Sequence, residues 1–130
     1  MAKRNKIIYW VATIWLALGM ISTGIVQILK AREGQGGADM IIHLGYPVYF
    51  LTIIGTWKIL GVIALLIPKN SLLKEWAYAG FFFLMTGALF SHMLSGDPVT
   101  EWLPSVLLLL LTIMSWHFRP LNRKMVVAPK

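Results

Sequence analysis

The chain has 130 residues, of which 58% are hydrophobic and only 13% are charged, and it contains no cysteine. Soluble domains carry about 25% charged residues, so this composition excludes an ordinary soluble protein and indicates an integral membrane protein. The absence of cysteine excludes disulfides and iron–sulfur clusters. The net charge of +7 does not indicate nucleic-acid binding, because the basic residues flank apolar runs and form no basic stripe.

Apolar runs of about 20 residues are long enough to cross the hydrocarbon core of a bilayer as α-helices. Four such runs predict membrane-spanning helices at about residues 7–29, 48–67, 75–94 and 102–118. The first run is too long for the apolar core of a cleaved signal peptide. The expected fold is therefore all-α, a four-helix bundle in a lipid bilayer that forms one membrane domain over residues 1–130.

Polar segments connect the four runs. In the first connector, residues 38–44 are expected to form a short interfacial helix with Asp39 as its cap. The last helix has two candidate starts, one at Trp102 and one at Pro98 with Asp97 as the cap. The residues alone do not decide between these two starts.

Lys58 lies near the middle of the second apolar run. A lysine at this depth costs about 2.5 to 3.5 kcal/mol on insertion scales, so it requires a partner, water or a path to the interface. Gly55 and Gly61 share its helix face, and small residues allow close helix packing in lipid, so Lys58 is expected inside the bundle. The alternative is that its side chain extends to the interface. Other glycines expected to face the interior are Gly19, Gly80 and Gly87.

The distribution of lysine and arginine predicts the orientation of the bundle. Nine of these residues lie in the head, the second connector and the tail, against two in the first connector and none in the third. Because cytoplasmic segments carry the excess of positive charge, both termini are expected in the cytoplasm. The first and third connectors are then expected on the outer side.

Six residues form the predicted polar site, which is a cavity near the outer face. They are Lys58, His92, Asp97, Ser91, Tyr46 and His43. Asp97 and Glu101 are expected to offset the charge of Lys58, with His92 as a hydrogen-bond link that titrates near neutral pH. The alternatives are that Asp97 caps a helix, that Glu101 is solvated and that Tyr46 is an interfacial anchor. The loop spacing matches no metal-ligand motif, so no metal site is predicted.

Four short motifs recur in the order and spacing of one family. They are HLGYP (43–47), KILG (58–61), KEWAYAGFFF (74–83) and SHMLSGDP (91–98). With these motifs the chain resembles the DoxX-like family of small bacterial four-helix membrane proteins. The resemblance implies a multi-pass protein of the bacterial cytoplasmic membrane. Broader DoxX relatives include membrane subunits of thiosulfate:quinone oxidoreductase, which implies a quinone ligand and a redox-enzyme partner. Those relatives often carry an acid near the position of Lys58.

The leading functional hypothesis is binding of a quinone-like or other small amphiphile, as a membrane partner of a redox enzyme or as a homo-oligomer. No resident cofactor is predicted apart from such a quinone. One alternative is transport of a small molecule or of protons, in which Lys58 changes protonation. Another is an accessory subunit whose polar residues only hold helices together. The usual enzyme motifs are absent from the sequence, which leaves open whether any reaction is catalysed.

Overall fold

The computed structural model describes residues 2–33 and 37–125. Its elements are α1 (Lys3–Glu33), α2 (Gly37–His43), α3 (Tyr49–Leu66), α4 (Ser71–Leu94), α5 (Val99–His117) and the 3₁₀ turn η1 (Leu121–Arg123). Within the described residues there is no strand, and α1, α3, α4 and α5 are long and apolar enough to cross a membrane. The predicted all-α, four-helix membrane fold is confirmed.

Three of the long helices begin before their expected starts, and α4 does so at Ser71 instead of Glu75. The first helix begins at Lys3 and so includes the basic head of the chain. The last helix begins at Val99, between the two candidate starts. Pro98 occupies its N-cap position with an extended backbone, and no side chain caps the helix. The alternative in which Asp97 caps this helix is therefore wrong, and its carboxylate bonds to two histidines instead.

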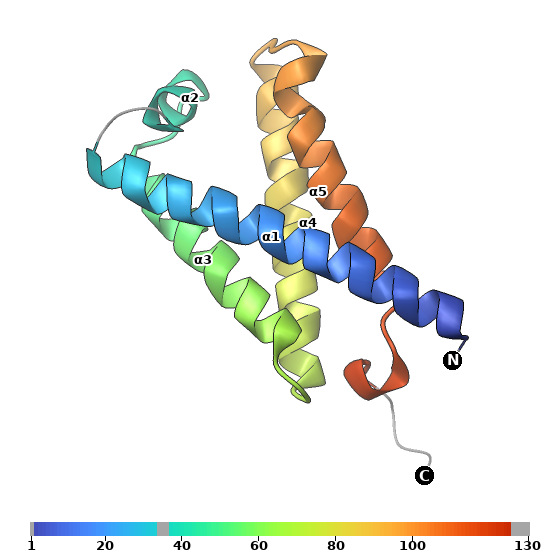
Figure 1. Ribbon diagram of the computed structural model, residues 1–130. Coiled ribbons are helices and arrows are strands. Elements are labelled where there is room, and N and C mark those ends of the chain that lie inside the picture. The colour runs from blue at the N-terminus through green and yellow to red at the C-terminus, as the bar shows by residue number, and fades with distance from the viewer. Residues whose placement is uncertain (1, 34–36, 126–130) are drawn as a thin grey trace.

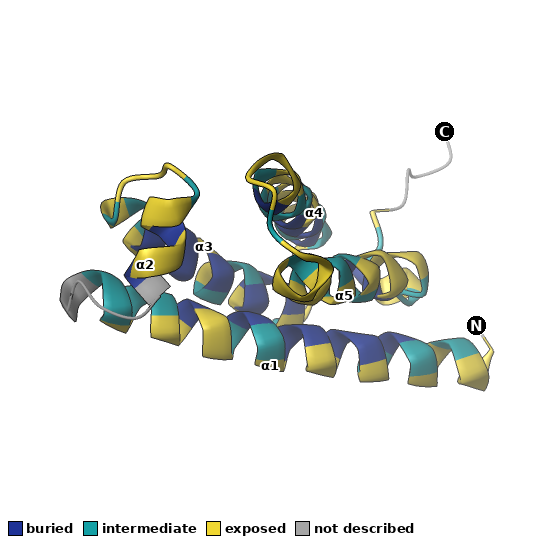
Figure 2. Cartoon of the chain, turned by 90° about the horizontal axis from the view of Figure 1, so that it is seen from above, coloured by how far each residue is buried: buried dark blue, intermediate teal, exposed yellow. Residues whose placement is uncertain are grey.

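The four long helices form two pairs that meet at one end and diverge at the other. The most extensive contacts are between α1 and α3 and between α4 and α5, and further contacts join α1 to α5 and α3 to α4. Figure 1 shows α3 and α4 close together at the turn that connects them and spread apart towards α2. Figure 2 shows from above that the buried faces of α1 and α3 are turned towards each other, whereas α4 stands away from α1. This divergence opens space between α3 and α4.

Apolar side chains fill the region where the helices converge. The main buried cluster consists of Leu16, Ala17, Met20, Val62, Leu65, Tyr78, Phe81 and Met85. A smaller cluster beneath α2 consists of Ala38, Ile41, Leu51 and Ile54, so the short helix is packed onto α3 by its own apolar side chains. Buried hydrogen bonds between the hydroxyl of Ser115 and those of Thr13 (2.6 Å) and Tyr78 (2.8 Å) join α1, α4 and α5.

Two glycines allow α1 and α3 to approach closely. A Cβ atom added at Gly55 would lie 2.7 Å from the carbonyl oxygen of Gly24, and one added at Gly24 would lie 3.1 Å from the carbonyl oxygen of Gly55. Atoms do not approach so closely without a shift of the backbone, so any side chain here would push the helices apart. Gly24 was not among the glycines predicted to face the interior.

Of the five glycines predicted to face the bundle interior, three pack closely against a neighbouring helix. Added Cβ atoms would lie 2.8 Å from Leu108 at Gly19 and 2.6 Å from Phe81 at Gly61, and Gly55 meets α1 as above. The other two, Gly80 and Gly87 in α4, face the space between α3 and α4 but do not pack against a neighbouring helix. Cβ atoms added at Gly80 and Gly87 would meet no atom of the described residues within 4 Å, because this face of α4 borders open space.

Candidate functional site

A cavity of about 960 Å³ lies between α3 and α4, and α1, α2 and α5 also contribute to its lining. Most of its lining is apolar or aromatic, including Ile54, Trp57, Phe81 and Leu84. Ligand pockets are typically clefts of roughly 300 to 1,000 Å³ with mostly apolar walls and a few placed polar groups, so both size and lining suit a small molecule. Trp57 of α3 lines the cavity and is 61% exposed, so the cavity is open between the helices and not enclosed.

Lys58 is the buried charge of this cavity. Its side chain lies in α3 with 5% of its surface exposed, and its Nζ donates a hydrogen bond of 3.1 Å to Thr23 Oγ1 of α1. The hydroxyl of Thr23 in turn donates to the carbonyl of Gly19 at 2.7 Å, so its oxygen is free to accept from the lysine. An ammonium carries three N–H donors, and the hydrogen bonds within the described residues use one of them. The structure therefore places Lys58 inside the bundle with unused donors.

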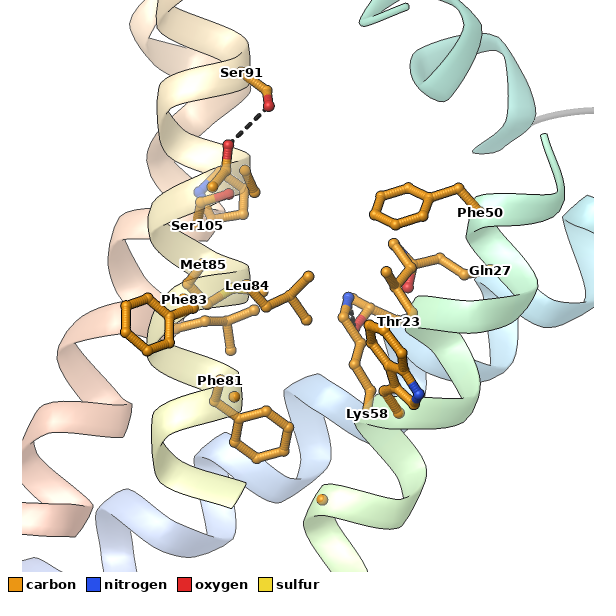
Figure 3. A pocket seen from close by; sticks show the side chains of 18 of the residues that line it. Thr23, Gln27, Phe50, Lys58, Phe81, Phe83, Leu84, Met85, Ser91 and Ser105 are labelled. Atoms are coloured by element: carbon orange, nitrogen blue, oxygen red, sulfur yellow. Dashed lines mark hydrogen bonds between the residues drawn. The ribbon is translucent and has the colours of Figure 1, made fainter. Parts of the chain in front are cut away.

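Gln27 adds a polar group to the same wall. It lines the cavity one helical turn beyond Thr23, and its Oε1 atom is buried without a hydrogen-bond partner among the residues described. Figure 3 shows Thr23, Gln27 and Lys58 on the wall formed by α1 and α3. Neither Thr23 nor Gln27 was a predicted site residue. Polar side chains four residues apart share one face of an apolar helix, and this spacing was the signal that could have identified them.

The opposite wall carries a second polar contact, between Tyr46 and Ser91. The Tyr46 hydroxyl lies 2.6 Å from Ser91 Oγ, and Ser91 donates its own proton to the carbonyl of Gly87 at 2.8 Å. Tyr46 is therefore the donor in its contact with Ser91. The Tyr46 ring also stacks on Phe50 at 5.1 Å. These contacts attach the segment between α2 and α3 to α4 at the open end of the bundle.

Asp97 joins two histidines beside this contact. Its two carboxylate oxygens lie 2.7 Å from His43 Nε2 and 2.7 Å from His92 Nδ1. An ionised carboxylate only accepts hydrogen bonds, so both of these ring nitrogens carry the proton. The hydrogen bond from His92, followed by that from His43, holds the pKa of Asp97 below its usual range. We refer to His43, Asp97 and His92 as the carboxylate bridge, which links α2 to the end of α4.

The structure separates the predicted site into two polar groups. Lys58, His92, Ser91 and Tyr46 all line the cavity, whereas His43 and Asp97 are not among the lining residues and lie behind His92. Figure 3 shows Lys58 and Ser91 on opposite walls. Four of the six predicted residues thus border one cavity, but no direct contact between Lys58 and the others is formed among the described residues.

The expected charge compensation of Lys58 by Asp97 and Glu101 is wrong. Within the described ranges, the ion pairs of Asp97 are with the two histidines, and Lys58 and Glu101 form none. The reason is position, because Asp97 is held by two nearer partners while Lys58 is directed to Thr23 of α1. The residues described also contain no group of three or more His, Cys, Asp or Glu side chains arranged to hold a metal ion.

Comparison with known protein families matches residues 11–115 of the chain to the DoxX-like family. The matched range contains α2, α3 and α4 and every residue of the two polar groups. Comparisons with curated proteins and with solved structures give no match.

Proposed function

The chain belongs to the DoxX-like family of membrane proteins, and from this premise we propose that it binds a small quinone-like amphiphile in the cavity between α3 and α4. The observation that carries the proposal is the buried Lys58 ammonium, which has a single described hydrogen bond and lines a large cavity that is otherwise mainly apolar. A charge buried in such surroundings costs free energy unless it binds a polar ligand or water.

The polar groups of the inner wall match the head of such a ligand. Lys58 offers N–H donors to a carbonyl or anionic oxygen, and the buried Oε1 of Gln27 offers an acceptor to a hydroxyl. A quinone presents carbonyls, and its reduced form presents hydroxyls, so the pair can engage both states. The aromatic and aliphatic lining supplies the surface that buries the ring.

The opening between the helices suits a ligand that reaches the site through the lipid. Trp57, Trp76 and Phe83 line the cavity and are largely exposed, on helices long and apolar enough to cross a membrane. An apolar tail can leave the cavity between these residues and stay in lipid, without passing through water. This arrangement favours membrane-partitioned amphiphiles over soluble metabolites.

The carboxylate bridge and the Tyr46 to Ser91 hydrogen bond would close the α2 end of the cavity. His92 has 5% of its surface exposed and lines the cavity on one side while it is bonded to Asp97 on the other. In the bacterial cytoplasmic membrane, with both termini in the cytoplasm, this end would face outward. It would then be the end at which a redox-enzyme partner could reach the ligand.

The test is equilibrium binding of decylubiquinone to the full chain in nanodiscs, followed by quenching of tryptophan fluorescence, since Trp57 and Trp76 line the cavity. Lys58→Met should weaken binding by about tenfold or more, because hydrogen bonds to charged groups contribute about 1.5 to 3 kcal/mol. Lys69→Met, which removes an exposed lysine from the turn after α3, is the matched control and should bind like wild type.

Two results would contradict the proposal. Equal affinity of wild type and Lys58→Met for decylubiquinone would show that the lysine does not contact the ligand. Failure of the wild-type protein to bind decylubiquinone or a short-chain menaquinone, while a second protein co-purifies with it, would favour the accessory role instead.

A further inference from the structure

A second pocket, of about 270 Å³, lies at the end of the bundle opposite α2. Its lining residues come from the start of α1 and from the end of α5 and the segment that follows, and they are Asn5, His117, Phe118, Arg119, Leu121 and Lys124. Figure 1 shows that the N-terminus, the end of α5 and η1 lie together at this end of the molecule. None of these residues belongs to the cavity proposed for the amphiphile.

Arg119 is held in place at the wall of this pocket. Its Nε lies 2.9 Å from Glu75 Oε1, its guanidinium lies 4.7 Å from the centroid of the Trp116 ring, and it donates to the Trp116 carbonyl. The indole of Trp116 donates to the other oxygen of Glu75 at 3.1 Å. An arginine fixed in this way loses little side-chain freedom when it binds an anion.

The charges around the pocket favour an anion. Arg119 and Lys124 are two cations against the one carboxylate of Glu75, which is not itself a lining residue. Within residues 2–33 and 37–125 the Lys124 ammonium forms no side-chain hydrogen bond or ion pair. The amide of Asn5 and the ring of His117 add N–H donors at the same pocket.

We propose that this pocket binds a phosphate-ester anion, and that its source is the headgroup of an anionic phospholipid. Phe118 and Leu121 add apolar surface beside the cations, which a lipid's glycerol and first methylenes can contact and a free phosphate cannot use. The pocket lies at the ends of α1 and α5, two helices long and apolar enough to cross a membrane, and the ends of such helices meet the lipid headgroups. Basic pockets at this position of helical membrane proteins suit anionic headgroups.

The experiment is native mass spectrometry of the full chain released from nanodiscs that contain equal amounts of phosphatidylglycerol and phosphatidylcholine. The wild-type protein should retain one phosphatidylglycerol in preference to phosphatidylcholine. Lys124→Gln should reduce this retention about fivefold, the change expected for loss of one lysine near a charged membrane surface. Lys69→Gln is the matched control at the same end of the bundle and should retain the lipid like wild type.

A parallel titration with inorganic phosphate separates the two sources of the anion. Retention of phosphatidylglycerol that millimolar phosphate does not displace supports the lipid headgroup. Displacement by phosphate, together with the loss in Lys124→Gln, supports the same phosphate chemistry with a soluble source. No preference for phosphatidylglycerol and no phosphate binding in wild type, or an equal loss in Lys124→Gln and Lys69→Gln, would overturn the site.

Discussion

The ammonium of Lys58 and the hydroxyl of Thr23 are joined by a hydrogen bond of 3.1 Å that crosses from α3 to α1. This contact lies one residue from Gly24, whose carbonyl is in close contact with Gly55. The close approach of the two helices therefore brings the hydroxyl within reach of the lysine. The hydrogen bond of the buried lysine therefore depends on the close packing of Gly24 and Gly55.

Substitution of both partners of this hydrogen bond should reveal their coupling. Thr23→Val removes the hydroxyl at nearly constant volume and leaves the buried ammonium without its partner, so it should destabilise the wild-type protein more than it destabilises Lys58→Met. We expect a coupling of about 0.5 to 2 kcal/mol, the range measured for hydrogen bonds between membrane helices. Unfolding of the four variants in mixed micelles measures it, and additive effects would show that the two side chains are not coupled.

The glycine contact between α1 and α3 should tolerate no side chain. Gly55→Ala places a Cβ 2.7 Å from a backbone oxygen, so the helices must separate, at a cost of about 1 to 3 kcal/mol. Gly80→Ala is the matched control, because its Cβ meets no atom of the described residues within 4 Å and alanine favours helix. Thermal unfolding in detergent should show a lower Tm only for Gly55→Ala, and an equal loss in both variants would contradict the packing.

Acid should weaken the carboxylate bridge. The hydrogen bonds from His92 and His43 lower the pKa of Asp97 in the folded protein. They therefore stabilise the folded state, and this stabilisation is complete above the unfolded pKa of about 3.9. This stabilisation is lost as the pH falls through the lower folded pKa. Limited proteolysis of the α2 segment should therefore accelerate below about pH 4 in wild type.

Asp97→Asn should remove this pH dependence, because the amide does not titrate. Asp39→Asn, at an exposed position of α2, should retain the wild-type profile and serves as the control. Identical acid profiles in wild type and Asp97→Asn would show that the bridge does not hold α2 in place.

Loss of one hydroxyl should loosen the attachment of α2 to α4. Tyr46→Phe removes the hydrogen bond to Ser91 but keeps the ring that stacks on Phe50. A neutral hydrogen bond contributes about 0.5 to 1.5 kcal/mol, so amide exchange in α2 should become about threefold to tenfold faster. Tyr49→Phe changes a hydroxyl of a largely exposed tyrosine and should leave the exchange unchanged. If both variants exchange alike, the Tyr46 contact does not restrain α2.

Composition was sufficient to predict the architecture, because the need to cover a bilayer core determines the length and polarity of each run. The glycines beside Lys58 correctly predicted that this residue lies inside the bundle. The same reasoning did not predict that Gly80 and Gly87 border a cavity. A glycine packed against a neighbouring helix and a glycine that lines a cavity look alike in sequence.

Sequence reasoning did not predict all the hydrogen-bond partners of the polar residues. Asp97 bonds to His43, 54 residues away, and this pairing depends on how the first connector folds back over α4. Orientation of a side chain at a loop end has no periodic signal comparable to that of a helix face. The expected link between Asp97 and His92 is present, but the second partner of Asp97, His43, was not predicted, and Gln27 was left out of the predicted site.

Photo-crosslinking with an azido-quinone in nanodiscs tests whether an amphiphile occupies the cavity between α3 and α4. Peptide mapping should find the label on α3 and α4 at lining residues such as Trp57 and Phe83, and excess decylubiquinone should abolish it. Labelling should also fall in Lys58→Met, whose fold can be checked by size-exclusion chromatography. Labels spread over the lipid-facing residues of all four long helices, unaffected by competitor and by Lys58→Met, would show that the amphiphile does not bind in this cavity.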